Sequence, residues 1–187
     1  GRHGSITPPV TSSSPIVIVG AGVLGLCTAF ELHRRGRAVL VVDPGEVNAS
    51  LVAAGMIAPA MESAIDDVSV DRARLFRAGR DLWPEFATAA GIALARRPAE
   101  WRGGDVGAME ARLRALGFDA RRDGASVTTD DDYQVEPTQA LAALRRGLGD
   151  AVVAGTVTTI ARADGGWRLE IGDQWLDAEA VVLATGA

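Results

Sequence analysis

The sequence contains no lysine, so all 19 of its basic residues are arginine. A Schiff-base enzyme and a Walker-type phosphate loop both depend on a lysine amine, and both classes are therefore excluded. One cysteine and two histidines are too few for a disulfide framework or a zinc site, and we expect no metal site. The net charge of −5 argues against nucleic acid as a main partner, because phosphate binding draws on basic surfaces.

Long apolar runs are also lacking. No run approaches the roughly 20 residues of a membrane-spanning helix, and no signal-peptide pattern precedes Ile16. These features predict a cytoplasmic protein without a membrane span. Residues 1–14 are rich in Gly, Ser, Pro and Thr, and we interpret them as a disordered lead-in or a tag remnant.

Residues 15–43 hold the most informative pattern of the chain. Ile16 to Val19 form a short apolar run that is typical of a buried parallel strand. Gly20, Gly22 and Gly25 then follow with the G-x-G-x-x-G spacing of a dinucleotide-binding turn. A helix is expected next, and its positive N-terminal end favours the phosphates of a dinucleotide.

The parts of this pattern have separate physical tasks. Gly20 allows a tight turn, Gly22 lets backbone N–H groups approach a pyrophosphate, and Gly25 lets the helix lie close to the sheet. A second buried strand is predicted over 39–42. Asp43 follows it, 18 residues after Gly25, where a carboxylate can accept hydrogen bonds from ribose hydroxyls. The register of all these parts predicts a nucleotide-binding unit.

The segment after Asp43 distinguishes flavin enzymes from nicotinamide enzymes, which share this opening. Residues 48–59 are mostly small, where a nicotinamide-binding fold would normally give another amphipathic helix. This stretch resembles the Ser-x-x-Ala-Gly-Gly-Met-type segment of the D-amino-acid oxidase family of flavoproteins, and looks most like its glycine-oxidase branch. Residues 181–186 resemble the family motif that returns the chain to the sheet. Residues 134–141 resemble its entry into the helix before an antiparallel crossover.

The resemblance implies an α/β fold and FAD as cofactor. A Rossmann-like FAD-binding domain with a three-stranded antiparallel crossover meander is expected over 15–62 and 137–187. A helical insertion and part of a second, substrate domain are expected over 63–136. The residues that the glycine motif and the resemblance together assign to FAD are Val19, Gly20, Ala21, Gly22, Val23, Leu24, Gly25, Asp43, Pro44, Ser50, Ala53, Ala54, Gly55, Met56, Val157, Ala184, Thr185 and Gly186.

The chain also departs from the family. Val52 and Ala54 stand where relatives often carry a serine and a second glycine. Family chains are much longer, and the tyrosine and arginine that hold the substrate lie in the part with no counterpart here, so we assign no catalytic residue. The chain is a fragment, one chain of a processed pair, or a protein without an active site of its own.

The leading functional hypothesis is an FAD-dependent oxidoreductase that acts on the C–N bond of amino acids or secondary amines, with this chain supplying the FAD-binding half. One alternative is a nicotinamide-dependent dehydrogenase, because the opening motif suits it equally well. The other is a non-catalytic FAD-binding fragment or subunit that needs a partner chain. We also expect a second chain or a homodimer to cover the exposed sheet.

Residues outside the nucleotide motifs predict ordinary packing elements. A long helix over 66–90 should bury Leu75, Leu82 and Phe86, with Pro84 as a kink or the start of a second helix, and with Arg72, Arg74, Arg77 and Arg80 in solvent. Residues 119–133 are expected to form a loop, in which Asp130 to Asp132 are a solvated turn or, less favoured, a cation site. Another helix should begin at Pro137 and bury Leu141, Leu144 and Leu148. Three strands are predicted over 151–160, 167–171 and 175–178.

Overall fold

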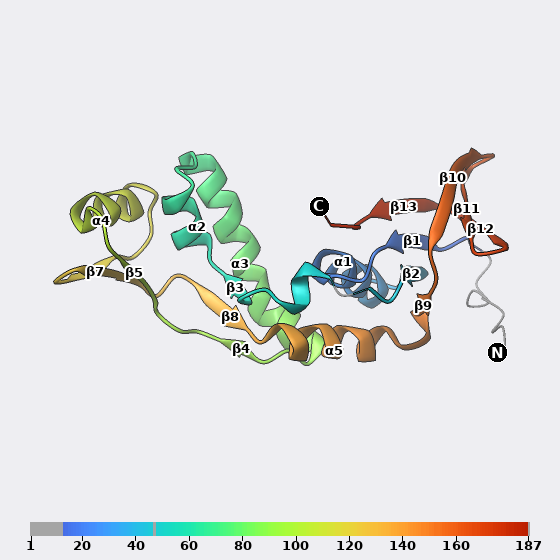
Figure 1. Cartoon of the computed structure of the whole chain (residues 1–187), viewed down its shortest axis with the longest axis horizontal. Coiled ribbons are helices and arrows are strands. Elements are labelled where there is room, and N and C mark those ends of the chain that lie inside the picture. The colour runs from blue at the N-terminus through green and yellow to red at the C-terminus, as the bar shows by residue number, and fades with distance from the viewer. Residues whose placement is uncertain (1–12, 47, 187) are drawn as a thin grey trace. The chain divides into compact units, whose positions relative to one another are not determined.

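The computed structural model describes residues 13–46 and 48–186 (Figure 1). The chain divides into two compact units, of which the first runs to Val52 and resumes at Leu141, and the second spans Ala53–Ala140. Helix α5 (Pro137–Leu148) passes from the second unit into the first. The lead-in predicted over 1–14 lies almost wholly outside the described residues.

The first unit is built on a four-stranded parallel sheet in the order β13-β1-β2-β9. Its strands are β1 (Ile16–Val19), β2 (Val39–Asp43), β9 (Val152–Ala154) and β13 (Ala180–Leu183). Strand β1 and the first four residues of β2 are continuous apolar runs because both faces of the sheet are covered. The predicted α/β fold with a parallel sheet is confirmed.

The two faces of this sheet pack against different elements. Val17, Leu40 and Val42 point to one face, where they form a core cluster with Leu169 and Ile171 of the antiparallel meander, among others. Side chains alternate between the two faces along each strand, so the residues between these point to the other face, where helix α1 (Val23–Arg34) lies, as Ile18 does. Packing on both faces of the sheet fixes the register of the strands, because a slip by one residue would move every side chain to the opposite face.

The meander consists of β10 (Val157–Ala163), β11 (Gly166–Ile171) and β12 (Gln174–Ala178), paired antiparallel in that order. The prediction of one strand over 151–160 is wrong, because β9 belongs to the parallel sheet and β10 to the meander. The chain changes sheets at Gly155, whose N–H donates to the carbonyl of Asp43. A Cβ there would lie 2.7 Å from a methyl carbon of Ile171, so the close passage needs glycine.

Helix α1 buries Leu26, Ala29 and Phe30. Val23 lies in the first turn of this helix and is exposed. Cys27 is partly buried, and burial raises the pKa of its thiol to about 12. It therefore fills space as a protonated thiol.

The second unit combines helices with two small antiparallel sheets (Figure 1). Buried alanines of its first two helices pack with Leu113, Phe118 and Val127 in one core. The sheets run in the orders β3-β8-β4 and β5-β7-β6. The elements are β3 (Met56–Ile57), α2 (Pro59–Ile65), α3 (Val70–Ala90), β4 (Leu94–Ala95), β5 (Ala99–Arg102), α4 (Val106–Ala115), β6 (Arg121–Asp123), β7 (Ser126–Thr129) and β8 (Tyr133–Val135).

Three predictions for this unit are wrong. The alternative that Pro84 starts a second helix is wrong, because helix α3 continues through it. Leu75 and Leu82 are exposed, and the buried residues of the helix are alanines. The predicted loop over 119–133 holds β6 and β7, which form a hairpin whose turn contains Gly124 with a φ of +55°. A short run of polar residues can pair as strands when a glycine turn and a neighbouring strand align it.

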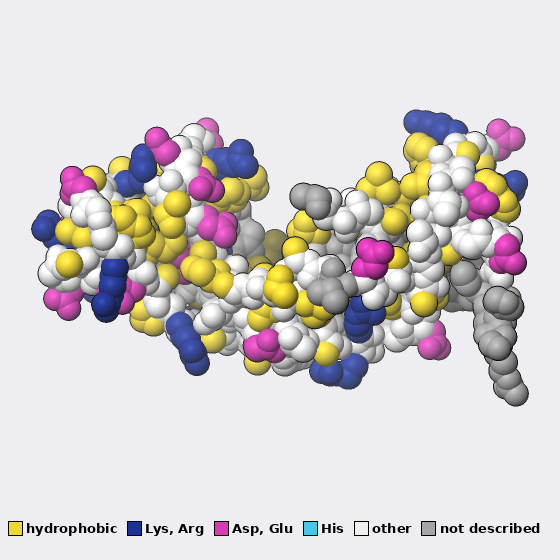
Figure 2. All heavy atoms as spheres, viewed as in Figure 1, with side chains coloured by type: hydrophobic (Ala, Val, Ile, Leu, Met, Phe, Trp, Pro, Cys, Tyr) yellow, Lys and Arg dark blue, Asp and Glu magenta, His cyan; other side chains and the backbone are white. Residues whose placement is uncertain are grey.

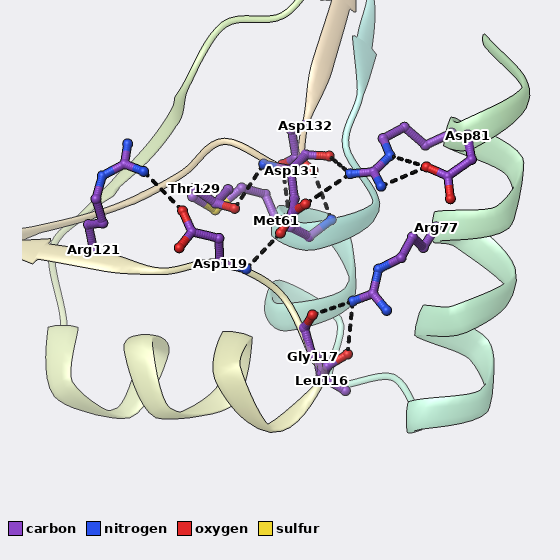
Figure 3. Close-up of polar contacts among 12 residues, drawn as sticks. Met61, Arg77, Asp81, Leu116, Gly117, Asp119, Arg121, Thr129, Asp131 and Asp132 are labelled. Atoms are coloured by element: carbon purple, nitrogen blue, oxygen red, sulfur yellow. Dashed lines mark hydrogen bonds and ion pairs between the residues drawn. The ribbon is translucent and has the colours of Figure 1, made fainter. Parts of the chain in front are cut away.

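The arginines of α3 are not all in solvent (Figure 3). The side chain of Arg80 is 10% exposed, pairs with Asp81, and donates to both the carbonyl and the carboxylate of Asp131. Arg77 donates to the carbonyls of Leu116 and Gly117. The expectation of solvated arginines is therefore wrong at Arg77 and Arg80, because their guanidinium groups satisfy oxygens of neighbouring elements.

The run Asp130 to Asp132 is likewise not a solvated turn throughout. Asp132 is 1% exposed, and its two oxygens accept hydrogen bonds from the N–H groups of Ala60 and Met61 at the start of α2. Asp130 pairs with Arg121. Among the described residues, no cluster of three or more His, Cys, Asp or Glu is placed to hold a metal ion.

Surface charge and the apolar content of the helices are the remaining features of the described part of the chain. Acidic and basic side chains are interspersed on the face drawn in Figure 2, which shows no large surface of one charge. None of the described helices has the length and apolar composition needed to cross a membrane.

Candidate functional site: the carboxyl end of the parallel sheet

The glycine-rich turn is held by contacts that leave no room for side chains. Gly20 has a φ of +109°, and a Cβ there would lie 2.2 Å from the carbonyl oxygen of Ala184. A Cβ on Gly25 would lie 2.0 Å from the carbonyl oxygen of Gly20. The predicted packing role of Gly25 is confirmed, because the first turns of α1 lie directly on the end of β1.

The N-terminus of α1 faces a polar side chain from another part of the first unit. Gly22 is the N-cap and offers no side-chain hydrogen bond of its own. The N–H of Val23 donates instead to Oγ of Ser50, at 3.0 Å, on the short 3-10 helix η1 (Ala49–Leu51). Leu24, on the first turn, is 74% exposed. This end of the helix therefore combines the backbone N–H groups of a helix N-terminus, a hydroxyl and an exposed first turn, which suits an anion.

The acid predicted to bind ribose lies at the end of β2 with two donors on it. Oδ1 of Asp43 accepts from the N–H of Gly45 at 3.0 Å, and Oδ2 accepts from Nη2 of Arg145 at 2.5 Å. Burial raises the pKa of Asp43, but the hydrogen bonds from Arg145 and Gly45 outweigh it and hold the pKa below its usual value. The carboxylate is thus ionised and accepts hydrogen bonds at neutral pH.

Asp43 lines a pocket of about 180 Å³ together with Ala21, Asn48, Leu141 and Arg145, among others. Oδ1 of Asn48 is buried and has no hydrogen-bond partner. An unpaired buried acceptor costs free energy, so this oxygen has an unused capacity to accept a hydrogen bond.

The other residues predicted for the site fall into two groups. Ala184 is held at the turn by its N–H, which donates to the carbonyl of Val19 at 2.8 Å, and Thr185 and Gly186 follow it on the exposed surface. The remaining residues, Pro44 and Val157, do not line this pocket: Pro44 is exposed after β2, and Val157 pairs with Ile171 on the meander.

Four predicted residues, Ala53 to Met56, belong to the second unit and are described there. Gly55 has a φ of +69°, and a Cβ on it would lie 1.9 Å from the carbonyl oxygen of Val135. Gly55 is thus required by packing against β8. Met56 is 49% exposed and is therefore not a core residue of the second unit.

Sequence reasoning missed Arg145 and Asn48. Arg145 lies on a helix whose buried line of leucines was predicted correctly, but only the tertiary fold shows that this helix passes the end of β2. Asn48 is a polar residue at the start of the stretch 48–59, which is mostly small residues. Its position five residues after the ribose acid was the available signal.

Comparison with known proteins agrees with this geometry. Residues 15–187 match the family model described as "FAD dependent oxidoreductase" (DAO). The tRNA 5-methylaminomethyl-2-thiouridine biosynthesis bifunctional protein MnmC of Caulobacter sp. (strain K31) is 30% identical over 207 residues, which cover 100% of this chain and 34% of that protein.

Solved structures share the fold. Glycine oxidase from Geobacillus kaustophilus superposes with a TM-score of 0.79 at 23% identity, over 95% of this chain and 56% of that one. Iminodiacetate oxidase from Chelativorans sp. BNC1 gives a TM-score of 0.74 at 20% identity, over 90% and 54% of the two chains. The chain thus spans about a third of the curated relative and just over half of these oxidases. Because the family model matches nearly the whole sequence, the chain belongs to the DAO family of FAD-dependent oxidoreductases.

Proposed function

We propose that this chain binds FAD in its first unit, with the pyrophosphate at the N-terminus of α1 and the adenosine in the pocket beside Asp43. The observation that carries the proposal is the buried, unpartnered Oδ1 of Asn48 in the same pocket as a ribose-type acid. The glycine turn adds to it, because it brings backbone donors to an open surface at the carboxyl end of a parallel sheet, where α/β folds bind nucleotides.

The residues present fit the dinucleotide in three ways. Glycine keeps the helix N-terminus uncrowded at position 22, because a Cβ there would lie only 3.2 Å from Oγ of Ser50. The ionised Asp43 can accept hydrogen bonds from ribose hydroxyls. Oδ1 of Asn48 can accept one hydrogen bond from the nucleotide, which would give this buried oxygen a partner.

The division of labour then follows from the fold. FAD supplies the oxidation–reduction chemistry when it is bound. Backbone N–H groups of the first turn of α1 and the hydroxyl of Ser50 would hold phosphate oxygens. From the family resemblance, Ala53, Ala54, Gly55 and Met56 of the second unit would contact the flavin ring. Residues 15–62 and 137–187 would form the FAD-binding domain, and 63–136 would belong to the substrate domain.

We further propose that the reaction is oxidation of the C–N bond of an amino acid or secondary amine. Support comes from family membership and from the glycine and iminodiacetate oxidases whose fold this chain shares. The nicotinamide alternative has no such support. By family resemblance the substrate-holding tyrosine and arginine have no counterpart here, so we expect no turnover by the 187-residue chain alone. A second chain or another part of the protein would supply these substrate-holding residues.

An absorbance titration tests the proposal. The purified chain should bind FAD and give a yellow complex, and FAD at a hundredfold excess over its Kd should raise the free energy of unfolding by about 2.7 kcal/mol. Asp43→Ala should weaken FAD binding without unfolding the chain. Asp173→Ala, in an exposed turn of the meander, is the matched control and should leave the Kd unchanged. A parent chain whose spectrum and melting temperature do not respond to FAD would refute FAD binding.

Turnover is tested separately by peroxide release or dye reduction with glycine, sarcosine and a panel of D- and L-amino acids. We expect no turnover from the chain alone, because small misplacement of a substrate costs orders of magnitude in rate. Clear turnover by the monomeric chain would place the substrate site within these 187 residues.

A further inference from the structure

Arg145 reaches the nucleotide pocket from α5, a helix far from the glycine motif in the sequence. Its Nη2 contacts Oδ2 of Asp43 across a separation of 102 residues. Leu141, one helical turn earlier, lines the same pocket. The side chain of Asp43 is 14% exposed and that of Arg145 is 41% exposed, so the carboxylate is largely covered while the guanidinium group is partly in solvent.

The two donors on Asp43 act on different oxygens. The N–H of Gly45 occupies one acceptor position of Oδ1, and Arg145 occupies one of Oδ2. A carboxylate offers about four acceptor positions, so each oxygen keeps one for a ribose hydroxyl. Because both oxygens are held, the plane of the carboxylate is fixed before a ligand arrives. Without Arg145, only the bond from Gly45 would hold the carboxylate.

Packing fixes the place from which Arg145 acts. Leu144 and Leu148 of α5 are buried in the first unit. A Cβ on Gly147 would lie 2.6 Å from a ring carbon of Phe30, so α5 lies directly against α1. These contacts set the rotation of the helix and thereby aim residue 145 at the end of β2.

We propose that Arg145 is a positioning residue for the adenosine ribose, which acts by orienting the Asp43 carboxylate and not by contact with the nucleotide. The proposal rests on the proposed FAD binding. In this arrangement α5 takes part in cofactor binding, because any change that moves the helix releases the acid. Pre-orientation of a binding group raises affinity by removing the cost of ordering it during binding.

A double-mutant cycle on binding tests this role. The Kd for FAD and for ADP, which carries the ribose and the phosphates without the flavin, is measured by calorimetry for the 187-residue chain. The variants are Arg145→Met, Asp43→Ala and the double mutant. Arg146→Met is the matched control, because Arg146 is the exposed neighbour on the same helix and does not line the pocket. Arg145→Lys tests rescue, since it keeps a donor and a charge.

We expect Arg145→Met to weaken both ligands about tenfold, which corresponds to about 1.4 kcal/mol. It should have no further effect when Asp43 is already alanine, and Arg145→Lys should recover part of the affinity. Equal losses from Arg145→Met in both backgrounds would show direct attraction of the phosphates and overturn the proposal. So would unchanged affinity, or tighter binding, which would show that Arg145 competes with the ribose.

The outcomes separate this inference from the proposed function. A parent chain that binds neither FAD nor ADP would overturn both. A parent that binds FAD, with an Arg145→Met variant of equal affinity, would overturn the role of Arg145 alone. Melting temperatures of the ligand-free variants show whether Arg145→Met has unfolded the chain. If Arg145→Met has unfolded the chain, the Kd of the Arg145→Lys variant for FAD is used instead. An Arg145→Lys variant that binds FAD as weakly as Asp43→Ala would contradict positioning by a charged donor.

Discussion

In the first unit, Asp43 and Asn48 line a pocket, and Oδ1 of Asn48 is buried without a partner. In the second unit, Asp130, Asp131 and Asp132 all have partners within the unit, namely Arg121, Arg80 and the N-terminus of α2. Both units therefore contain carboxylates that lie at the ends of secondary-structure elements. They differ in whether the hydrogen-bonding capacity of the group is already used.

This difference separates binding groups from structural groups. The acids of the second unit looked more like a ligand site in the sequence, because three stand side by side. Their oxygens are used by arginines and backbone N–H groups, as Figure 3 shows for Asp131 and Asp132. The single acid of the first unit keeps acceptor positions that face a pocket. Ser63 Oγ in the second unit is also buried without a partner, but it lies on the buried face of α2 with Ala60 and Ala64. The location of unused acceptors is thus more informative than the density of acids.

Among the variants that test this difference between the units, Gly22→Leu should have the largest effect, and the effect is on FAD affinity. Gly22 has extended backbone angles that any residue adopts, so the variant should fold, but its side chain would fill the space at the start of α1. We expect FAD binding to weaken at least a hundredfold, about 2.8 kcal/mol. Gly79→Leu is the control, because a Cβ at Gly79 meets no atom within 4 Å. Equal FAD affinity in Gly22→Leu and the parent would disprove close approach of a phosphate to this turn.

The second effect should appear in stability and not in binding. Asp132→Ala leaves the N–H groups of Ala60 and Met61 without their acceptor inside the second unit. We expect a loss of about 1–3 kcal/mol in the free energy of unfolding by urea. Asp130→Ala, at an exposed ion pair, should cost about 0–1 kcal/mol. A loss of FAD affinity in Asp132→Ala that exceeds its effect on folding would contradict the separation of the two units' roles.

A third effect is a pH dependence of opposite sign in the two units. The pKa of Asp43 is lowered, mainly by Arg145 and Gly45 against the cost of burial, so its stabilising contribution is present above its unfolded pKa and is lost as pH falls through the lower folded value. The pKa of Asp132 is raised by burial, against the hydrogen bonds from Ala60 and Met61. Its favourable contribution is therefore present at low pH and is lost as pH rises through the raised value.

Urea unfolding of the parent, Asp43→Asn and Asp132→Asn across a pH series measures how the contribution of each carboxylate to the free energy of unfolding changes with pH. The destabilisation by Asp43→Asn should shrink as pH falls below about 4, the ordinary range of an aspartate. The destabilisation by Asp132→Asn should shrink as pH rises above that range. Parallel curves for the two variants would show that the environments of the two carboxylates do not differ in the stated way.

Sequence reasoning reached the first unit far better than the second. The strand, turn, helix and acid of residues 15–43 are local in sequence, and their pattern follows from two-sided burial and close backbone approach. The strands β6 and β7 were missed, because their residues are polar and their pairing depends on β5. Arg80 was placed in solvent, because its partner Asp131 is 51 residues away. The pocket residue Arg145 escaped for the same reason.

The smallest effect concerns Cys27 of α1, the single cysteine of the chain. Burial raises the pKa of its thiol to about 12, so almost no reactive thiolate exists in the folded first unit. Labelling by a thiol reagent should therefore require opening of that unit, and FAD should slow it. Asp132→Ala acts in the second unit and should leave the labelling rate unchanged if the units open independently. Labelling rates with and without FAD, in the parent and in Asp132→Ala, are the measurement. Faster labelling in Asp132→Ala would show that the two units unfold together, and fast labelling of the parent would contradict a buried thiol.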